Sequence, residues 1–109
     1  MGGGAQLGEF ELLVMLAALH RRSDAYAVTI ADELRQRSGR DTSRGALYVT
    51  LKRLEGKGFL TSRMGAPEGE RSGRRRRYYT ATPEGIAAVG QAREAMRRMW
   101  KGLEGELGR

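Results

Sequence analysis

The spacing of the apolar residues changes at Gly58, and this change limits what the chain can fold into. Before it, the leucines at 47, 51 and 54 recur at intervals of four and three, which places them on one face of a helix. After it, apolar and polar residues alternate over 59–64, as in a half-buried strand. Proline, glycine and serine over 65–73 predict a loop, and a second strand is expected over 74–81. The sequence therefore predicts a helix that leads into a hairpin with a long tip.

Four helices are predicted, three before the hairpin and one after it: 7–20, 25–37, 44–57 and 83–109. Asp24 is the expected N-cap of the second helix, and Thr42 or Ser43 that of the third. Thr82 caps the last helix in this prediction, with Pro83 at its first position. The order helix, helix, helix, strand, loop, strand is that of a winged helix-turn-helix, an α+β fold that is mostly helical. We expect a flexible leader over 1–6, a winged-helix domain over 7–82 and a C-terminal dimerisation helix over 83–109.

Positive charge is concentrated in the middle of the chain. The 109 residues carry a formal net charge of +7, yet residues 35–82 alone hold thirteen basic and four acidic side chains. A cationic middle between nearly neutral ends is the pattern expected of a surface that meets a polyanion, although mixed solvating charge is the alternative. The chain has no cysteine, which excludes disulfides and thiolate metal sites and fits the reducing cytoplasm.

The third helix has a face suited to the DNA major groove. Opposite its leucines, helical geometry places Gly45, Val49, Lys52 and Arg53, with Arg44 and Tyr48 at the flanks. Glycine allows close approach of the backbone, valine can touch a thymine methyl group, and the cations offer donors to phosphates or guanine edges. The alternative is an ordinary solvated helix face.

Four consecutive arginines precede a tyrosine pair in the second strand. Alternation puts Arg75, Arg77 and Tyr79 on one face, and Arg74, Arg76 and Tyr78 on the other. One tyrosine is expected to pack against the domain while the arginines near the tip, with Arg71, extend toward phosphates or a narrow minor groove. For Arg76 and Arg77, pairing with Glu55 or Glu84 is the competing interpretation.

The last helix carries an apolar stripe that is close to a heptad seam. Its members are Ile86, Val89, Ala92, Met96, Met99, Leu103 and Leu107. A chain of this size cannot cover the whole stripe, so we expect it to pair with a second copy. Trp100, with Met96 and Met99, suggests a pocket for a small aromatic effector, and the competing interpretation is a dimer core with a partly exposed tryptophan.

Other kinds of site are not supported by the sequence. His20 is the only histidine, so no histidine pair can bind a metal within one chain, and we predict neither a metal site nor a cofactor. Nothing resembles a nucleophile–base pair or a P-loop, and we therefore predict no enzyme. The longest apolar run, 12–19, is too short to span a membrane.

Two segments carry a resemblance to a known family: DAYAVTIADELRQRSGRDTSRGALYVTLKRLEGKGFLTSR and GRRRRYYTATPEG. Over about residues 7–90 the chain resembles PadR-family transcriptional regulators, of the small class with a single C-terminal helix. The resemblance implies a cytoplasmic homodimeric repressor that binds operator DNA and is often released by a small molecule. It also implies DNA contacts by Ser43, Arg44, Tyr48, Lys52 and the basic wing. Ala27, Val28 and Ala81 depart from the family pattern and affect local packing.

Two other functions remain open for the same basic face. One is an RNA-binding or ribosome-associated module, for which Tyr78 and Tyr79 are the only candidate stacking pair. The other is a winged helix that binds an acidic protein partner.

Overall fold

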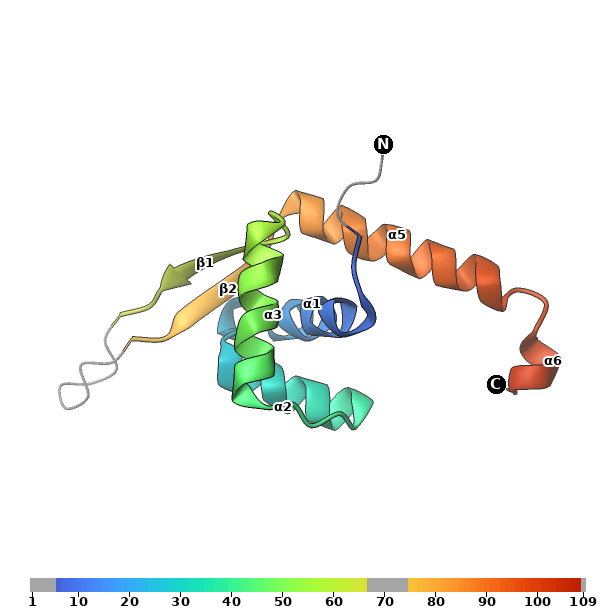
Figure 1. Ribbon diagram of the computed structural model, residues 1–109, viewed down its shortest axis with the longest axis horizontal. Helices are drawn as coiled ribbons and strands as arrows, with labels where there is room; N and C mark the ends of the chain where they lie inside the picture. The colour runs from blue at the N-terminus through green and yellow to red at the C-terminus, as the bar shows by residue number, and fades with distance from the viewer. Residues whose placement is uncertain (1–5, 67–74, 109) are drawn as a thin grey trace.

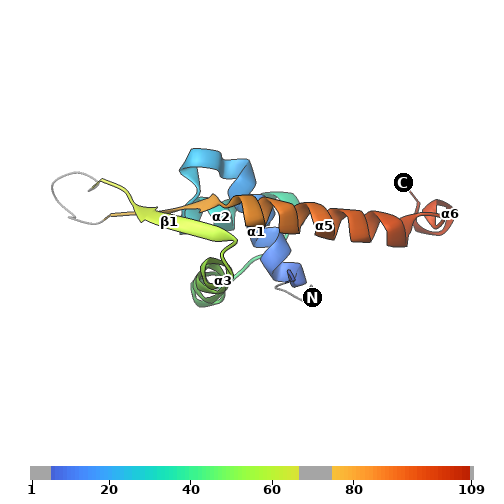
Figure 2. The ribbon, with the colours of Figure 1, turned by 90° about the horizontal axis from the view of Figure 1, so that it is seen from above.

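The computed structural model describes residues 6–66 and 75–108. Its elements, in chain order, are α1 (Glu9–Arg21), the 3-10 turn η1 (Arg22–Asp24), α2 (Ala27–Ser38), α3 (Arg44–Gly56), β1 (Leu60–Met64), β2 (Arg77–Ala81), α5 (Pro83–Trp100) and α6 (Glu104–Leu107). Helices α1, α2 and α3 cluster together, the hairpin projects to one side of them, and α5 projects to the other (Figures 1 and 2). This is the predicted winged helix-turn-helix.

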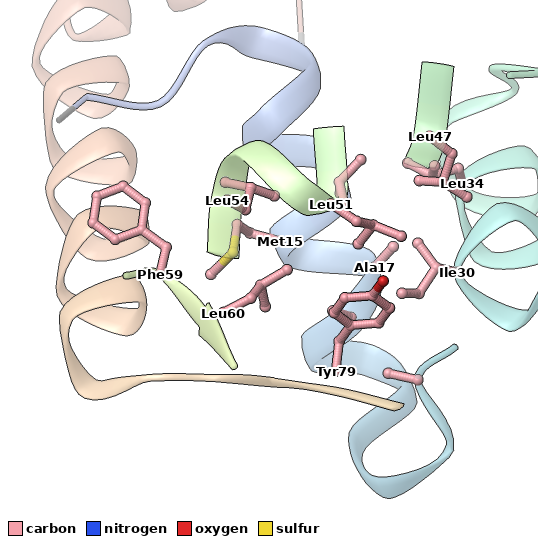
Figure 3. Packing of buried hydrophobic residues seen from close by; sticks show 13 residues of the cluster. Met15, Ala17, Ile30, Leu34, Leu47, Leu51, Leu54, Phe59, Leu60 and Tyr79 are labelled. Carbon is pink, nitrogen blue, oxygen red and sulfur yellow. The ribbon is translucent and has the colours of Figure 1, made fainter. Parts of the chain in front are cut away.

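The core lies where the three helices meet the base of the hairpin. Strands β1 and β2 pair antiparallel, with Leu60 opposite Ala81 and Met64 opposite Arg77. Figure 3 shows the Tyr79 ring among the leucines and isoleucine of the helices, and its side chain is buried. The Tyr79 amide also donates to the Ala25 carbonyl oxygen at 2.8 Å, which attaches the segment between α1 and α2 to the sheet. The prediction that one tyrosine anchors the wing is confirmed.

Helices α3 and α5 each follow a residue whose side chain accepts a hydrogen bond from a free backbone amide of the first turn. The Ser43 hydroxyl accepts from the Ala46 amide at 3.0 Å, and Thr82 caps α5 in the same way. The prediction of Asp24 as the cap of α2 is wrong, because α2 begins at Ala27 after an extended Tyr26. Ala25 must stay extended to pair with β2, and this long-range bond delays the helix by two residues.

The C-terminal segment is not one helix over 83–109, which corrects the sequence prediction. Helix α5 ends at Trp100, Gly102 has a φ of +93°, and the short α6 follows. A left-handed glycine ends a helix readily, since it adopts this conformation without strain. Leu103 and Leu107 therefore lie outside the face of α5 that carries the rest of the stripe.

The first turns of α5 are fixed to the body, and the remainder extends away from it. Gly85 is buried, and Ala88 and Val89 pack against the core cluster. Farther along, the large apolar side chains of α5 are exposed, and the molecule is 57 Å long but only 22 Å across its thinnest dimension. In the described part of the chain, no helix combines the length and the apolar character that crossing a membrane requires.

Candidate nucleic-acid interface

The outer face of α3 is open to solvent along its length. Leu47, Thr50, Leu51 and Leu54 are buried against the body. The opposite face exposes Tyr48 and Val49, at 54% and 53% of their surface, together with Gly45, Lys52 and Arg53. The helix therefore presents the residues that the sequence placed on its outward face.

The first turn of α3 combines exposed side chains with free backbone. Ser43 and Arg44 are exposed at its start, and apart from the helix's own neighbouring backbone nothing lies within 4 Å of where a Cβ on Gly45 would stand. Farther along the helix, the Lys52 ammonium lies 5.6 Å from the centre of the Tyr48 ring, within range of a cation–π contact. The positive end of the helix dipole adds to these cations, so this end of α3 attracts an anion.

The other end of α3 meets a buried acid that the sequence reasoning missed. The Lys57 ammonium lies 2.7 Å from Glu11 Oε1, and the Arg53 guanidinium lies 3.8 Å from Glu11 Oε2. Burial alone would raise the pKa of Glu11, but hydrogen bonds from Lys57 and the Gly8 amide, with the charges of Lys57 and Arg53, leave this pKa lowered. The two partners are 46 positions apart, and no local pattern indicates the pairing.

At the base of the wing, Arg77 is held by a polar chain. Its guanidinium donates to the Ser62 hydroxyl at 3.0 Å, and that hydroxyl donates to a Glu55 carboxylate oxygen at 2.6 Å. The competing interpretation, in which Arg77 pairs with Glu55, thus holds through Ser62. Burial raises the pKa of the Tyr79 phenol beside it, and the Glu55 charge adds to this effect.

The outer face of the hairpin carries two stacked tyrosines with an arginine on each side. Arg63 lies 5.0 Å from the Tyr78 ring, Tyr78 meets Tyr26 edge to face at 5.5 Å, and Arg76 lies 4.3 Å from the Tyr26 ring. These four residues, the wing-base stack, join β1, β2 and the start of α2. Sequence reasoning missed Arg63 and Tyr26, whose neighbours come from distant positions in the chain.

Of the other wing arginines, Arg75 is exposed just before β2. Arg71 and Arg74, both predicted DNA contacts, lie outside the described residues.

The apolar stripe of α5 is largely exposed. Ile86, Met96, Met99 and Trp100 each expose between 44% and 73% of their surface, whereas Val89 is half-buried. Leu103 and Leu107, beyond the end of the helix, are exposed as well.

Two cavities lie elsewhere in the described part of the chain. One, of about 170 Å³, lies between α1 and α2, and one of about 280 Å³ lies between α2 and α3. Neither is lined by Met96, Met99 or Trp100, which the sequence suggested for an effector pocket. Within residues 6–66 and 75–108, no group of three or more histidine, aspartate or glutamate side chains is placed to hold a metal ion.

A model of the PadR-like family of transcriptional regulators matches residues 15–91, well over half of the chain. The chain belongs to the PadR-like family. The transcriptional regulator Rv3488 of Mycobacterium tuberculosis is 39% identical over 88 residues, which span 79% of this chain and 78% of that protein.

Solved structures of PadR-family regulators have the same fold. One from Clostridium difficile R20291 matches with a TM-score of 0.70 at 29% identity, over 89% of this chain and 98% of that one. Another, from Eggerthella lenta DSM 2243, gives a TM-score of 0.67 at 25% identity over 92% and 87% of the two chains. The family resemblance seen in the sequence is confirmed: this PadR-like protein is a transcriptional regulator and not an enzyme.

Proposed function

We propose that this PadR-like regulator binds duplex DNA as a homodimer and represses transcription by occupying its operator. The observation that carries the proposal is the exposed face of α3, where Tyr48, Val49 and Lys52 stand free beside a basic hairpin. In this proposal α3 enters the major groove with its N-terminal half, which includes Arg44 and Gly45, and with its N-cap Ser43. The wing arginines meet the flanking backbone or the minor groove.

The dimer is proposed from the apolar side chains that one copy leaves uncovered. Ile86, Met96, Met99 and Trp100 are large, exposed and carried by a helix that leaves the body, so their burial needs a second surface. The most economical partner is the same helix of a second copy, because a two-fold axis makes one patch complementary to itself. Val89, Leu103 and Leu107 would extend this contact.

Trp100 reports on this assembly, because it is the only tryptophan in the chain. Dimerisation is expected to bury its ring and shift its fluorescence to shorter wavelengths. A small aromatic effector bound against Met96, Met99 and Trp100 would change that emission again. Titration of the folded dimer with planar aromatic compounds tests this part of the proposal, and no response across a broad panel would contradict it.

Affinity in this scheme comes mostly from phosphate contacts. A dimer that neutralises ~6–10 phosphates loses about 10³–10⁵ in affinity between 50 and 200 mM salt. Fluorescence anisotropy with labelled duplexes measures this slope directly. A flat response to salt would contradict the proposed interface.

Variants separate the roles of the helix and the wing. Lys52→Gln is expected to relax sequence preference, because Lys52 is proposed to reach a base edge. Arg75→Gln is expected to weaken all duplexes alike and to lower the salt slope by about one phosphate contact. Arg22→Gln is the matched control: it removes the same charge from the turn after α1, on the opposite side of the molecule from α3 (Figure 2). If the three changes had equal effects on binding, affinity would depend on net charge alone, and the proposed interface would be wrong.

A further inference from the structure

A buried ion cluster joins the C-terminal end of α3 to the start of α1. The Glu11 side chain is only 7% exposed, and its Oε1 accepts from Lys57 Nζ at 2.7 Å and from the Gly8 amide at 2.8 Å. Lys57 Nζ also donates to the Gln6 carbonyl oxygen at 2.7 Å. Glu11 and Lys57, here called the α1–α3 clamp, thus connect three segments of the chain.

The charges of the clamp suit the helix ends that carry them. Glu11 lies in the first turn of α1, where the positive end of the helix dipole favours an anion, and Lys57 is the C-cap of α3, where a cation is favoured. A buried carboxylate of this kind is costly without its partners, so α3 cannot move from α1 without breaking the bonds that Lys57 donates to Glu11 and to Gln6. The clamp therefore fixes the orientation of α3, and Lys57 is engaged within the protein.

Arg53 is related to Glu11 in a different way. Its side chain is 53% exposed, and its nearest approach to Glu11 is 3.8 Å, longer than a hydrogen bond. It also follows Lys52 on the side of α3 that faces solvent. In this half-exposed pair the guanidinium can turn toward the buried carboxylate or toward an external phosphate, so the two anions compete for it.

We propose that Glu11 sets the DNA specificity of α3, by fixing the helix through Lys57 and by competing with phosphate for Arg53. Glu11 is a positioning residue in this account, since it contacts the cations of α3 and not the DNA. By holding Arg53, Glu11 lowers the sequence-independent attraction of the C-terminal end of α3 for DNA phosphates. Discrimination between DNA sequences then depends on the N-terminal half of α3, which faces the groove. This inference rests on the proposed binding of duplex DNA.

The test compares Glu11→Gln with Glu9→Gln in the full chain. Both changes remove one negative charge from the first turn of α1, but Glu9 is 81% exposed and lies 3.7 Å from Arg40. Salt titrations use a labelled duplex of random sequence and a duplex selected for tight binding. Glu11→Gln is expected to steepen the salt slope for random DNA by about 0.9 and to raise affinity for it several-fold at 0.1 M salt. It should also reduce the ratio of selected to random affinity, while Glu9→Gln leaves both quantities near the wild-type values.

A second substitution assigns the gain to Arg53. Adding Arg53→Gln to Glu11→Gln is expected to return the salt slope to the wild-type value. Thermal melting shows whether each variant is folded. If Glu11→Gln fails to fold, two single substitutions test the proposal instead. Arg53→Gln should lower the salt slope clearly less than Arg75→Gln does, and equal losses would overturn the proposal.

The outcomes separate this inference from the proposed function. If the wild-type chain does not bind duplex DNA at low salt, the proposed function itself is contradicted. A wild-type chain that binds them, with Glu11→Gln and Glu9→Gln giving the same slope and the same affinity ratio, overturns only the role of Glu11.

Discussion

At Gly85, α5 passes very close to the backbone of the rest of the fold. A Cβ added there would stand 2.2 Å from the Phe59 carbonyl oxygen and 2.9 Å from the Met15 methyl group. A backbone oxygen cannot move aside as the end of a flexible side chain can. Gly85→Ala therefore requires α5 to retreat by about 1 Å, which the close packing of the core resists.

The magnitude follows from what that retreat breaks. Thr82, at the start of α5, donates its amide to the Phe59 carbonyl oxygen at 3.0 Å and its hydroxyl to the Gly58 carbonyl oxygen at 2.6 Å. Loss of these two bonds costs about 2 kcal/mol. Strain in the packing adds about 2 kcal/mol, and the better helix propensity of alanine returns about 1 kcal/mol. The net loss of unfolding free energy is about 3 kcal/mol, or roughly 10–20 °C in Tm.

Gly90→Ala is the matched control for this change. It makes the same substitution in the same helix, but apart from the neighbouring backbone of that helix nothing lies within 4 Å of the new Cβ. We expect it to raise the unfolding free energy by up to ~1 kcal/mol. Urea unfolding followed by circular dichroism, at equal protein concentration, measures both variants. A Gly85→Ala protein as stable as Gly90→Ala would refute the close approach of α5.

Three further predictions concern the wing, the α3 surface and the α1–α3 clamp. Tyr26→Leu should lower the unfolding free energy by about 1–2 kcal/mol through loss of ring contacts in the wing-base stack. Tyr26→Phe keeps the ring and should be nearly as stable as the wild type, and urea melts measure both variants. Gly45→Ala should stabilise the fold by up to ~1 kcal/mol yet weaken duplex binding, measured by anisotropy, because the methyl group stands where the groove would approach. The pKa of Glu11 is lowered in the fold, so in acid the unfolded chain binds more protons than the folded one. The contribution of Glu11 to stability is therefore present at neutral pH and is lost as the pH falls through that lowered pKa. In urea melts from pH 7 to 3, the unfolding free energy of the wild type should therefore approach that of Glu11→Gln. A difference between the two proteins that stays constant with pH would contradict this prediction.

Features set by near neighbours in the chain were predictable from the sequence. The leucines of α3 determined its inner face and hence the exposure of Tyr48, Val49 and Lys52. The caps formed by Ser43 and Thr82 depend on groups three residues away, and both predictions are confirmed. Caps and helix faces can be predicted because they depend only on residues within a turn or two of each other.

Features set by distant partners were not predictable in this way. Asp24 looked like a cap because the pairing of Ala25 with Tyr79 is invisible in a local window. The contact of Tyr26 with Tyr78 and the bond between Glu11 and Lys57 join residues about fifty positions apart, and only the assembled fold brings them together. The apolar stripe indicated one helix over 83–109, whereas the left-handed conformation of Gly102, which ends α5 nearby, follows from the structure.

The central claim is that two copies of this chain place two α3 helices and two wings on one DNA duplex. Selection of bound duplexes from a random pool by the purified protein tests it most directly. The account predicts a two-fold symmetric consensus whose half-sites are centred about one helical turn, or a multiple of it, apart. Recovery of an asymmetric single site, or of no enriched duplex in dilute buffer, would contradict it.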